Sequence, residues 1–266
     1  MGRIVLFLIL CFTLFMNNLA ADPRIIFSKG YSALSHGDLD SALSYFRQLE
    51  DLHITSPQLF YNMGIIFFDK KQFSLSRLYF ERAKFLDPGF EDNNFNLKQV
   101  VSILESNFPV ELKINTGVKG WHEWLSKVSL KSVIWVLTLL YVLLLLSVIP
   151  LFIARNWKWF TIFTVVFIIW FALLVVAWEK INFTFTPMGI ILHKCEMRMT
   201  PDKQSKVMLE LPSGVKIQIV ERVPFWIKVT LENGITGWIA EKKVGLINPP
   251  YFFHVPTAVR KILSIH

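Results

Sequence analysis

The chain has few of the residues that build reactive centres. Its 266 residues include two cysteines and six histidines, and they contain no HExxH, phosphate-binding glycine loop or GxSxG sequence. If the apolar N-terminal run that holds Cys11 is removed, Cys195 is left alone and an intrachain disulfide is excluded. The histidines are scattered, without metal-ligand spacing. We therefore expect no catalytic residues, no metal and no cofactor.

Positive charge is in excess, but it is not concentrated. The chain has 28 lysines and arginines against 20 aspartates and glutamates, a net charge of +8. Residues 22–90 and 91–131 each carry equal numbers of basic and acidic side chains. The excess is spread over the other segments, without a basic stripe interleaved with aromatic residues. This distribution argues against a nucleic-acid partner.

Charge is absent from two long apolar runs. Ser132–Ala154 and Phe160–Trp178 contain no charged residue, and each is close to the length of about 20 residues that crosses a bilayer as a helix. Only a short turn, 155–159, separates them. The runs predict a transmembrane hairpin with both flanking regions on the same side of the lipid bilayer. Because ion and proton pathways normally need ionisable residues in the membrane, a transporter or channel is disfavoured.

The first 21 residues have the pattern of an export signal. Arg3 precedes the apolar run Ile4–Met16, and the small residues Ala20 and Ala21 follow. Two interpretations remain open, a cleaved signal peptide over residues 1–21 and an uncleaved anchor. Both export the next domain, so we expect the hairpin turn in the cytoplasm and both soluble domains outside it.

A period of 34 residues runs through the N-terminal third of the chain. Gly30 aligns with Gly64, and Phe46 aligns with Phe80. Glycine allows paired helices to approach closely, and phenylalanine fills the space between them. The pattern predicts antiparallel helix pairs. Turns are expected at 36–38 and 70–72.

This pattern resembles the tetratricopeptide family over Pro23–Phe90, closely in the second copy and loosely in the first. A third helix, about Glu91–Ser106, has Lys98 where the family has glycine, so we expect it to cap the array. The expected core face of that helix consists of Phe95, Leu97, Val100 and Leu104. Residues 22–106 are thus predicted to be an all-α repeat domain.

The resemblance implies a protein-binding groove on the concave face, formed by the first helix of each pair. By position, this face would present Arg24, Phe27, Tyr31, Gln58, Tyr61, Ile65 and Phe68. The set is apolar and aromatic with one cation, and it lacks the lysines and asparagines that would bind a C-terminal carboxylate. The alternative is that these side chains only pack against one another or against the capping helix.

Residues 107–131 link the repeat to the first apolar run. From Gly120, the sequence GWHEWLSKVSLK is compatible with an amphipathic helix at the bilayer surface. Trp121 and Trp124 would then lie at the level of the lipid headgroups.

Beyond Gly189 the hydrophobic period changes to two, as in Val215, Ile217 and Ile219. Turn signals such as Asn233-Gly234 divide residues 189–247 into five expected short strands. A small all-β barrel accommodates such strands.

Four motifs in this region resemble the bacterial SH3 domain. They are Arg198-Met199-Thr200-Pro201, Leu211-Pro212-Ser213-Gly214-Val215, Trp226-Ile227-Lys228-Val229 and Asn233-Gly234-Ile235-Thr236-Gly237-Trp238-Ile239. Gly237 is expected to permit close strand approach. The resemblance implies a ligand groove, for protein or murein peptides, formed by Phe225, Trp226 and Trp238. The alternative is that these aromatic side chains fill the barrel core.

The order of export signal, helical repeat, membrane hairpin and SH3-like barrel resembles that of the BatE-type proteins of bacterial aerotolerance operons. The resemblance includes the ending Gly237–Ile247, and a tail, 248–266, follows it. The expected fold class is a multidomain membrane protein with an all-α repeat, a transmembrane hairpin and an SH3-like barrel. The resemblance implies a bacterial inner-membrane protein with periplasmic domains. Its implied partners are Bat-type proteins with von Willebrand-type domains, in a complex linked to stress or oxygen tolerance. We expect a non-enzymatic scaffold; the alternative is a sensor that binds murein peptides.

Overall fold

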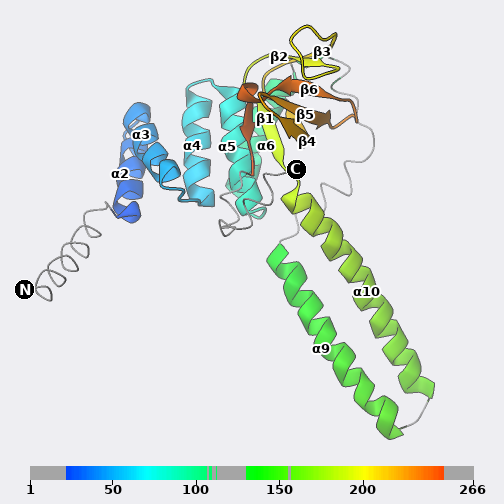
Figure 1. Cartoon of the computed structure of the whole chain (residues 1–266). Helices are drawn as coiled ribbons and strands as arrows, with labels where there is room; N and C mark the ends of the chain where they lie inside the picture. The colour runs from blue at the N-terminus through cyan, green and yellow to red at the C-terminus, as the bar shows by residue number, and fades with distance from the viewer. Residues whose placement is uncertain (1–21, 107, 110–111, 113–129, 155–156, 249–266) are drawn as a thin grey trace, which may run out of the picture.

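The computed structural model describes residues 22–106, 108–109, 112, 130–154 and 157–248. Within them lie an N-terminal array of helices, a pair of long helices and an antiparallel sheet (Figure 1). The predicted signal peptide, the predicted interfacial helix from Gly120 and the tail beyond Asn248 lie outside the described residues.

The N-terminal array has a regular spacing of helices. Its described helices are α2 (Pro23–Ser35), α3 (Leu39–Asp51), α4 (Pro57–Asp69), α5 (Phe73–Leu86) and α6 (Glu91–Glu105). Helices α2, α4 and α6 begin at residues 23, 57 and 91, which are 34 apart, and both predicted turns lie between the paired helices. The side chains of Asp22, Asp38 and Ser56 accept backbone hydrogen bonds and cap the first three helices.

The same glycine–phenylalanine contact occurs in both helix pairs. A Cβ atom on Gly30 would lie 2.6 Å from the Phe46 ring, and one on Gly64 would lie 2.5 Å from the Phe80 ring. Both rings are fully buried. The Ser76 hydroxyl donates a hydrogen bond of 2.9 Å to the Gly64 carbonyl oxygen, which satisfies a buried polar group. Any larger residue at either glycine would push the helices apart.

Helix α6 covers the end of the array with three of the four residues expected for its core face. Leu97, Val100 and Leu104 are buried in a cluster with Phe80. The prediction for Phe95 is wrong, because its side chain is 63 % exposed. Two residues turn an α-helix by about 200°, so Phe95 and Leu97 point to opposite sides.

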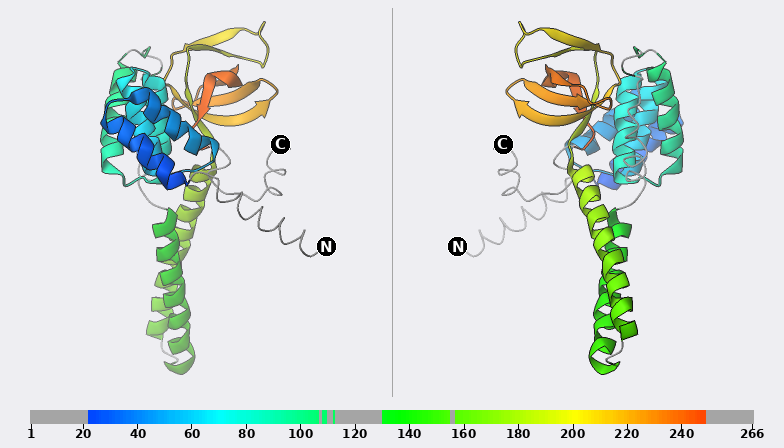
Figure 2. Two further views of the ribbon diagram at one scale, coloured as in Figure 1. Left: turned by 90° about the vertical axis from the view of Figure 1, so that its left-hand side faces the viewer. Right: turned by 90° about the vertical axis from the view of Figure 1, so that its right-hand side faces the viewer.

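Helices α9 (Leu130–Ala154) and α10 (Trp157–Phe185) form an antiparallel pair that projects away from the array and the sheet (Figures 1 and 2). Among the described residues, one stretch is long and apolar enough to cross a membrane, Trp157–Asn182 in α10; the apolar stretch Ser132–Val148 in α9 is shorter. Because α10 already begins at Trp157, the turn predicted at 155–159 is too long.

The sheet contains seven described strands rather than the five expected. They are β1 (Met188–Ile191), β2 (Cys195–Arg198), β3 (Val207–Leu211), β4 (Lys216–Val223), β5 (Trp226–Leu231), β6 (Thr236–Ala240) and β7 (Val244–Leu246), in the order β3-β2-β6-β5-β4-β1-β7. A Cβ atom on Gly237 would lie 2.5 Å from the Met197 side chain. This glycine therefore allows β2 and β6 to approach closely, as the sequence predicts.

Helix α10 is joined to the sheet by a short, bridged connection. The side-chain oxygen of Asn248 accepts a hydrogen bond of 2.8 Å from the Met188 backbone, and its amide donates one of 2.9 Å to the Thr186 carbonyl. The buried Asn248 side chain thus ties the end of α10 to the beginning of β1.

The sheet packs on the N-terminal array through helix α5. Leu78 of α5 shares a buried cluster with Ile190 and Ile247. A Cβ atom on Gly245 would lie 2.5 Å from the Leu78 side chain. The helix therefore contacts β1 and β7 at van der Waals distance.

Two arginines of α5 bind backbone carbonyls of the sheet region. Arg77 Nη1 donates to the Gly214 carbonyl at 2.9 Å, and Arg82 Nε donates to the Leu246 carbonyl at 3.0 Å. Arg82 also forms an ion pair of 2.5 Å with Glu50 of α3. Because β7 is the last strand of the sheet, Arg82 satisfies an edge carbonyl and links it to both helix pairs.

A buried ion pair completes this interface. Lys216 Nζ of β4 lies 2.8 Å from Glu81 Oε2, and Glu81 is only 7 % exposed. Burial acts to raise the pKa of Glu81, but the charges of Lys216 and Arg77 outweigh it and hold that pKa below its ordinary value. The carboxylate is therefore ionised at neutral pH and bound by a cation from the other domain.

We expect loss of this ion pair to destabilise the whole chain. Glu81→Ala leaves Lys216 without its acidic partner and should lower the stability by about 3 kcal/mol. The double variant Glu81→Leu/Lys216→Met should recover most of that loss, because it removes both charges. Thermal unfolding of the detergent-solubilised chain measures both effects. Glu210→Ala, which breaks the exposed pair with Lys194, is the control and should change the melting temperature little.

The same pair predicts a pH dependence. The folded-state pKa of Glu81 lies below the ordinary 4.5, so its contribution is fully present above that value and is lost as the pH falls through the lowered pKa. The gap in melting temperature between the unsubstituted chain and Glu81→Gln should be widest near neutral pH and should narrow below about 4.5. A gap of constant size down to pH 3 would show that Glu81 is not ionised in this interface.

Candidate functional site

The sheet packs on α5, so it covers the side of the second helix pair opposite to α4.

The residues expected on the concave face of the first pair are accessible. Tyr31 is 58 % exposed and Arg24 is exposed. Phe27 is half-buried, with its ring centroid 5.7 Å from that of Phe46. Arg24 and Tyr31 are thus free to meet a ligand, whereas Phe27 is partly used in packing.

The residues expected from the second pair are shared between packing and surface. Tyr61, Ile65 and Phe68 are half-buried against the cluster formed with α6, while Gln58 is exposed. The Tyr61 hydroxyl accepts a hydrogen bond of 3.0 Å from the amide of Asn96. Tyr61, Ile65 and Phe68 therefore pack partly against the capping helix, which was the alternative to a binding role.

An exposed aromatic residue of α6 extends this face. Phe27, Tyr61 and Phe95 occupy the same position in α2, α4 and α6, since each is the fifth residue of its helix. Phe95 was predicted to face the core because Lys98, found where glycine is expected, favoured a helix that only covers the array. The 34-residue spacing itself was the signal that aligns Phe95 with Phe27 and Tyr61.

The expected aromatic groove of the sheet lies on its outer face. Ile227 and Val229 point into the core, so the alternating Trp226 and Lys228 point away from it. Trp226 is half-buried there. Trp226 therefore does not fill the barrel core, which was the alternative to a role in the groove.

Trp238 lies between two cations on the same outer face. It stands opposite Lys228 across the β5–β6 pair and opposite Arg198 across the β2–β6 pair. Lys228 Nζ lies 5.9 Å from the Trp238 ring centroid, within reach of a cation–π interaction. Trp238 is only 9 % exposed, so a ligand would meet the flanking cations before the ring.

Phe225 occupies a strained position at the tip of the β4–β5 hairpin. It is 84 % exposed and has a φ of 69°, which is rare for a bulky side chain and costs about 1–3 kcal/mol. The Glu241 amide donates a hydrogen bond of 3.1 Å to the Phe225 carbonyl and helps to hold the turn. Of the three predicted groove residues, Phe225 is the one fully available for contact.

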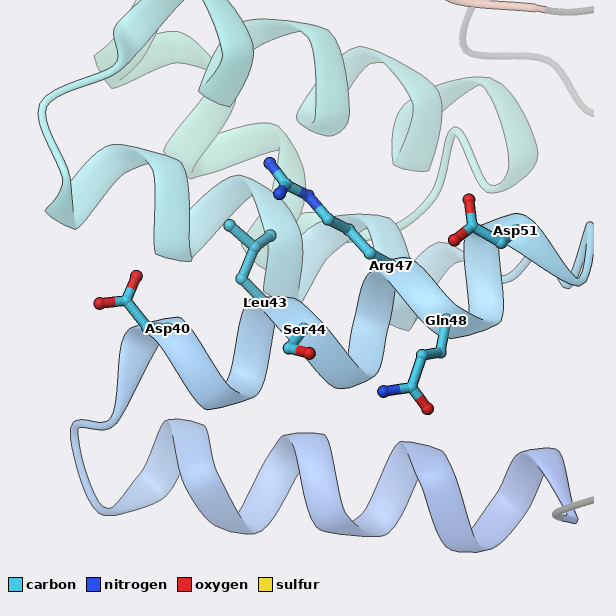
Figure 3. Close-up of a pocket in the computed structure, with 6 residues that line it drawn as sticks. All are labelled: Asp40, Leu43, Ser44, Arg47, Gln48 and Asp51. Carbon is cyan, nitrogen blue, oxygen red and sulfur yellow. The ribbon is translucent and has the colours of Figure 1, made fainter.

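A shallow hollow of about 330 Å³ lies along α3 (Figure 3). Asp40 and Asp51 stand near opposite ends of this helix, with Arg47 between them. The two aspartates are eleven positions apart, which is about 16 Å along a helix. They therefore cannot act as a pair on one substrate atom.

The described residues offer little for metal or thiol chemistry. The described part of the chain contains no group of three or more histidine, cysteine or acidic residues placed to hold a metal ion. Burial raises the pKa of Cys195 to about 11, so its reactive thiolate form is scarce at neutral pH.

Comparison with known families identifies the sheet. Residues 196–244 match the family model described as bacterial SH3 domain. The match runs from β2 to the first residue of β7, and β1 precedes it. No curated protein matches the chain. The C-terminal sheet is therefore a bacterial SH3 domain, and it follows a helical N-terminal region.

Proposed function

We propose that the protein is a non-enzymatic, membrane-anchored scaffold that binds protein partners through its helical array and its SH3 domain. The interface formed by Arg77, Glu81 and Arg82 of α5 carries this proposal. It holds two binding surfaces in one body and presents them at a fixed spacing. A scaffold needs such an arrangement, whereas an enzyme needs reactive groups that converge on one point.

The same interface supports a transmembrane hairpin. The array precedes α9 and the SH3 domain follows α10, yet the two touch through α5. A single crossing by α10 would place them on opposite sides of the bilayer, so α9 and α10 cross together. Their exposed apolar side chains, such as Trp135 and Phe171, then face lipid. We place the hairpin in the bacterial inner membrane, with both domains in the periplasm.

The array acts as a tetratricopeptide-type protein-binding module. The repeated contact of Gly30 with Phe46 and of Gly64 with Phe80 supports this assignment. Its concave face offers Tyr31 and Phe95 as exposed aromatic side chains, the residue type that often dominates protein interfaces. The BatE-type resemblance makes exported Bat-type proteins with von Willebrand-type domains the preferred partners.

We expect the double variant Tyr31→Ala/Phe95→Ala to lose partner binding. Truncation of two aromatic contacts should lower the yield of crosslinked, co-purified periplasmic protein about tenfold or more. Leu52→Ala is the matched control, because Leu52 is an exposed apolar residue just after α3, away from the first helices of the pairs. Equal recovery with all three proteins would exclude the concave face as the binding surface.

A second candidate function is binding of murein peptides by the SH3 domain. The family match and the exposed, strained Phe225 beside Trp226 favour it. If it is correct, murein sacculi retain the solubilised chain and retain Phe225→Ala/Trp226→Ala several-fold less. Ile235→Ala, in the turn between β5 and β6, serves as the control. A chain that sacculi do not retain would leave the SH3 domain as a protein-binding module only.

A further inference from the structure

Helices α2, α4 and α6 carry matched positions on one side. In each helix the second, fifth and ninth residues are three and four positions apart, so they form one stripe along the helix. The fifth positions are all aromatic, Phe27, Tyr61 and Phe95. Phe95 and Tyr31, the ninth residue of α2, are 63 % and 58 % exposed. The centre of these stripes therefore offers aromatic surface to a ligand.

Contacts between the helices set the three stripes side by side. The Asn96 amide donates a hydrogen bond of 3.0 Å to the Tyr61 hydroxyl oxygen. Because Asn96 lies one helical turn after Asp92 and next to Phe95, this bond turns their side of α6 towards α4. Helix α2 contacts α4 directly, whereas the sheet packs on α5. The stripes therefore form one surface that the sheet leaves uncovered.

The charge of this surface changes from one end to the other. The second residue is Arg24 in α2, Gln58 in α4 and Asp92 in α6, and all three are exposed. Within the described part of the chain, neither Arg24 nor Asp92 forms an ion pair. The Asp22 carboxylate accepts a hydrogen bond of 2.9 Å from the Arg24 backbone amide and is used to cap α2. The surface thus has a cation at the α2 end and a carboxylate at the α6 end.

The Asp92 carboxylate acts on the aromatic centre of the surface. Burial raises the pKa of the Tyr61 hydroxyl, and the negative charge of Asp92 raises it further. The Tyr61 ring centroid lies 4.9 Å from that of Phe90. A basic side chain at this end would meet a carboxylate and aromatic rings together, and both attract a lysine or an arginine.

The separation of the two charges sets the length of a matching segment. Neighbouring helices pack about 8–10 Å apart, so α2 and α6 lie about 20 Å apart across α4. An extended chain rises about 3.3 Å per residue, and its side chains alternate between two faces. Two side chains about six positions apart therefore span this distance and point to the same side of the segment.

We propose that this surface selects an extended segment of a partner protein with an acidic residue at one end, apolar or aromatic residues in the middle and a basic residue about six positions away. The acidic residue meets Arg24, and the basic residue meets Asp92. The inference rests on the proposed function, since it specifies the chemistry of what the array binds. The aromatic centre supplies the contact area, and the two charges decide which segments fit.

Three synthetic peptides with blocked ends test the inference. The matched peptide, Glu-Ser-Phe-Ser-Leu-Ser-Lys, carries its charged and apolar side chains on one face, and the other two have lysine or glutamate at both ends. Fluorescence anisotropy with the detergent-solubilised full chain measures their affinities. The matched peptide should bind about fivefold more tightly than either of the others at low ionic strength. Salt at about 1 M should remove most of this difference, because it screens exposed charges.

Reversal of one charge should change which peptide is preferred. Arg24→Glu makes both ends of the surface acidic and should favour the peptide with two lysines, whereas Asp92→Lys should favour the peptide with two glutamates. Asp92→Asn should bind the matched and two-glutamate peptides equally, which covers the case that Asp92→Lys does not fold. Lys29→Glu is the matched control, because Lys29 is exposed on α2 about 140° around the helix from Arg24. It should keep the preference for the matched peptide. Circular dichroism verifies that each variant is folded.

Equal affinities of the three peptides for the unsubstituted chain would overturn the inference and leave an apolar contact surface that does not read charge. A preference that Arg24→Glu and Asp92→Asn leave unchanged would overturn it as well, and so would the absence of binding by all three peptides. In each case the crosslinking experiment with Tyr31→Ala/Phe95→Ala still decides the proposed function, because it depends on the aromatic side chains and not on the two charges.

Discussion

The contact between α5 and the SH3 domain is the constraint on which the rest of the structure depends. It combines a buried cluster around Leu78 with the Glu81–Lys216 ion pair and with arginine bonds to two backbone carbonyls. Because it joins segments that flank the long helices, it fixes the array and the SH3 domain as one body at the base of α9 and α10. The predicted concave face is not covered by the sheet, because the sheet packs on α5 and not on α2 or α4.

Local periodicity predicted the elements but could not predict how they are joined. The 34-residue spacing located the turns after α2 and α4, and the period of two located the strands, because both patterns are fixed by short-range geometry. Arg77, Glu81 and Arg82 read as the polar face of an amphipathic helix. Two of their partners are carbonyl oxygens, which leave no trace in a sequence, and the other two, Lys216 and Glu50, lie far away along the chain. Phe108 packs against both the α6 cluster and the sheet core, and this was not predicted because its partners are distant in the sequence.

The sequence predicted which residue types line the candidate binding surfaces more accurately than it predicted how exposed each side chain is. Tyr31 and Arg24 are accessible, but Tyr61, Ile65 and Phe68 divide their surface between packing and solvent. Phe95 was assigned to the core, although the 34-residue spacing aligns it with Phe27 and Tyr61. Trp226 and Trp238 are separated from the core by strand alternation, and only the register with Lys228 and Arg198 reveals that Trp238 is flanked by two cations.

The most direct test of this account is the topology of the chain in cells. Alkaline phosphatase, which is active only outside the cytoplasm, would be fused after Lys113 and after Ile247, with a third fusion after Asn156 between the long helices. The account predicts activity at the first two positions and none at the third, since the array and the SH3 domain touch and so share one side of the membrane, which we propose to be the periplasmic side. Activity at only one of the first two positions would contradict it, because domains on opposite sides of a membrane cannot form the Glu81–Lys216 contact.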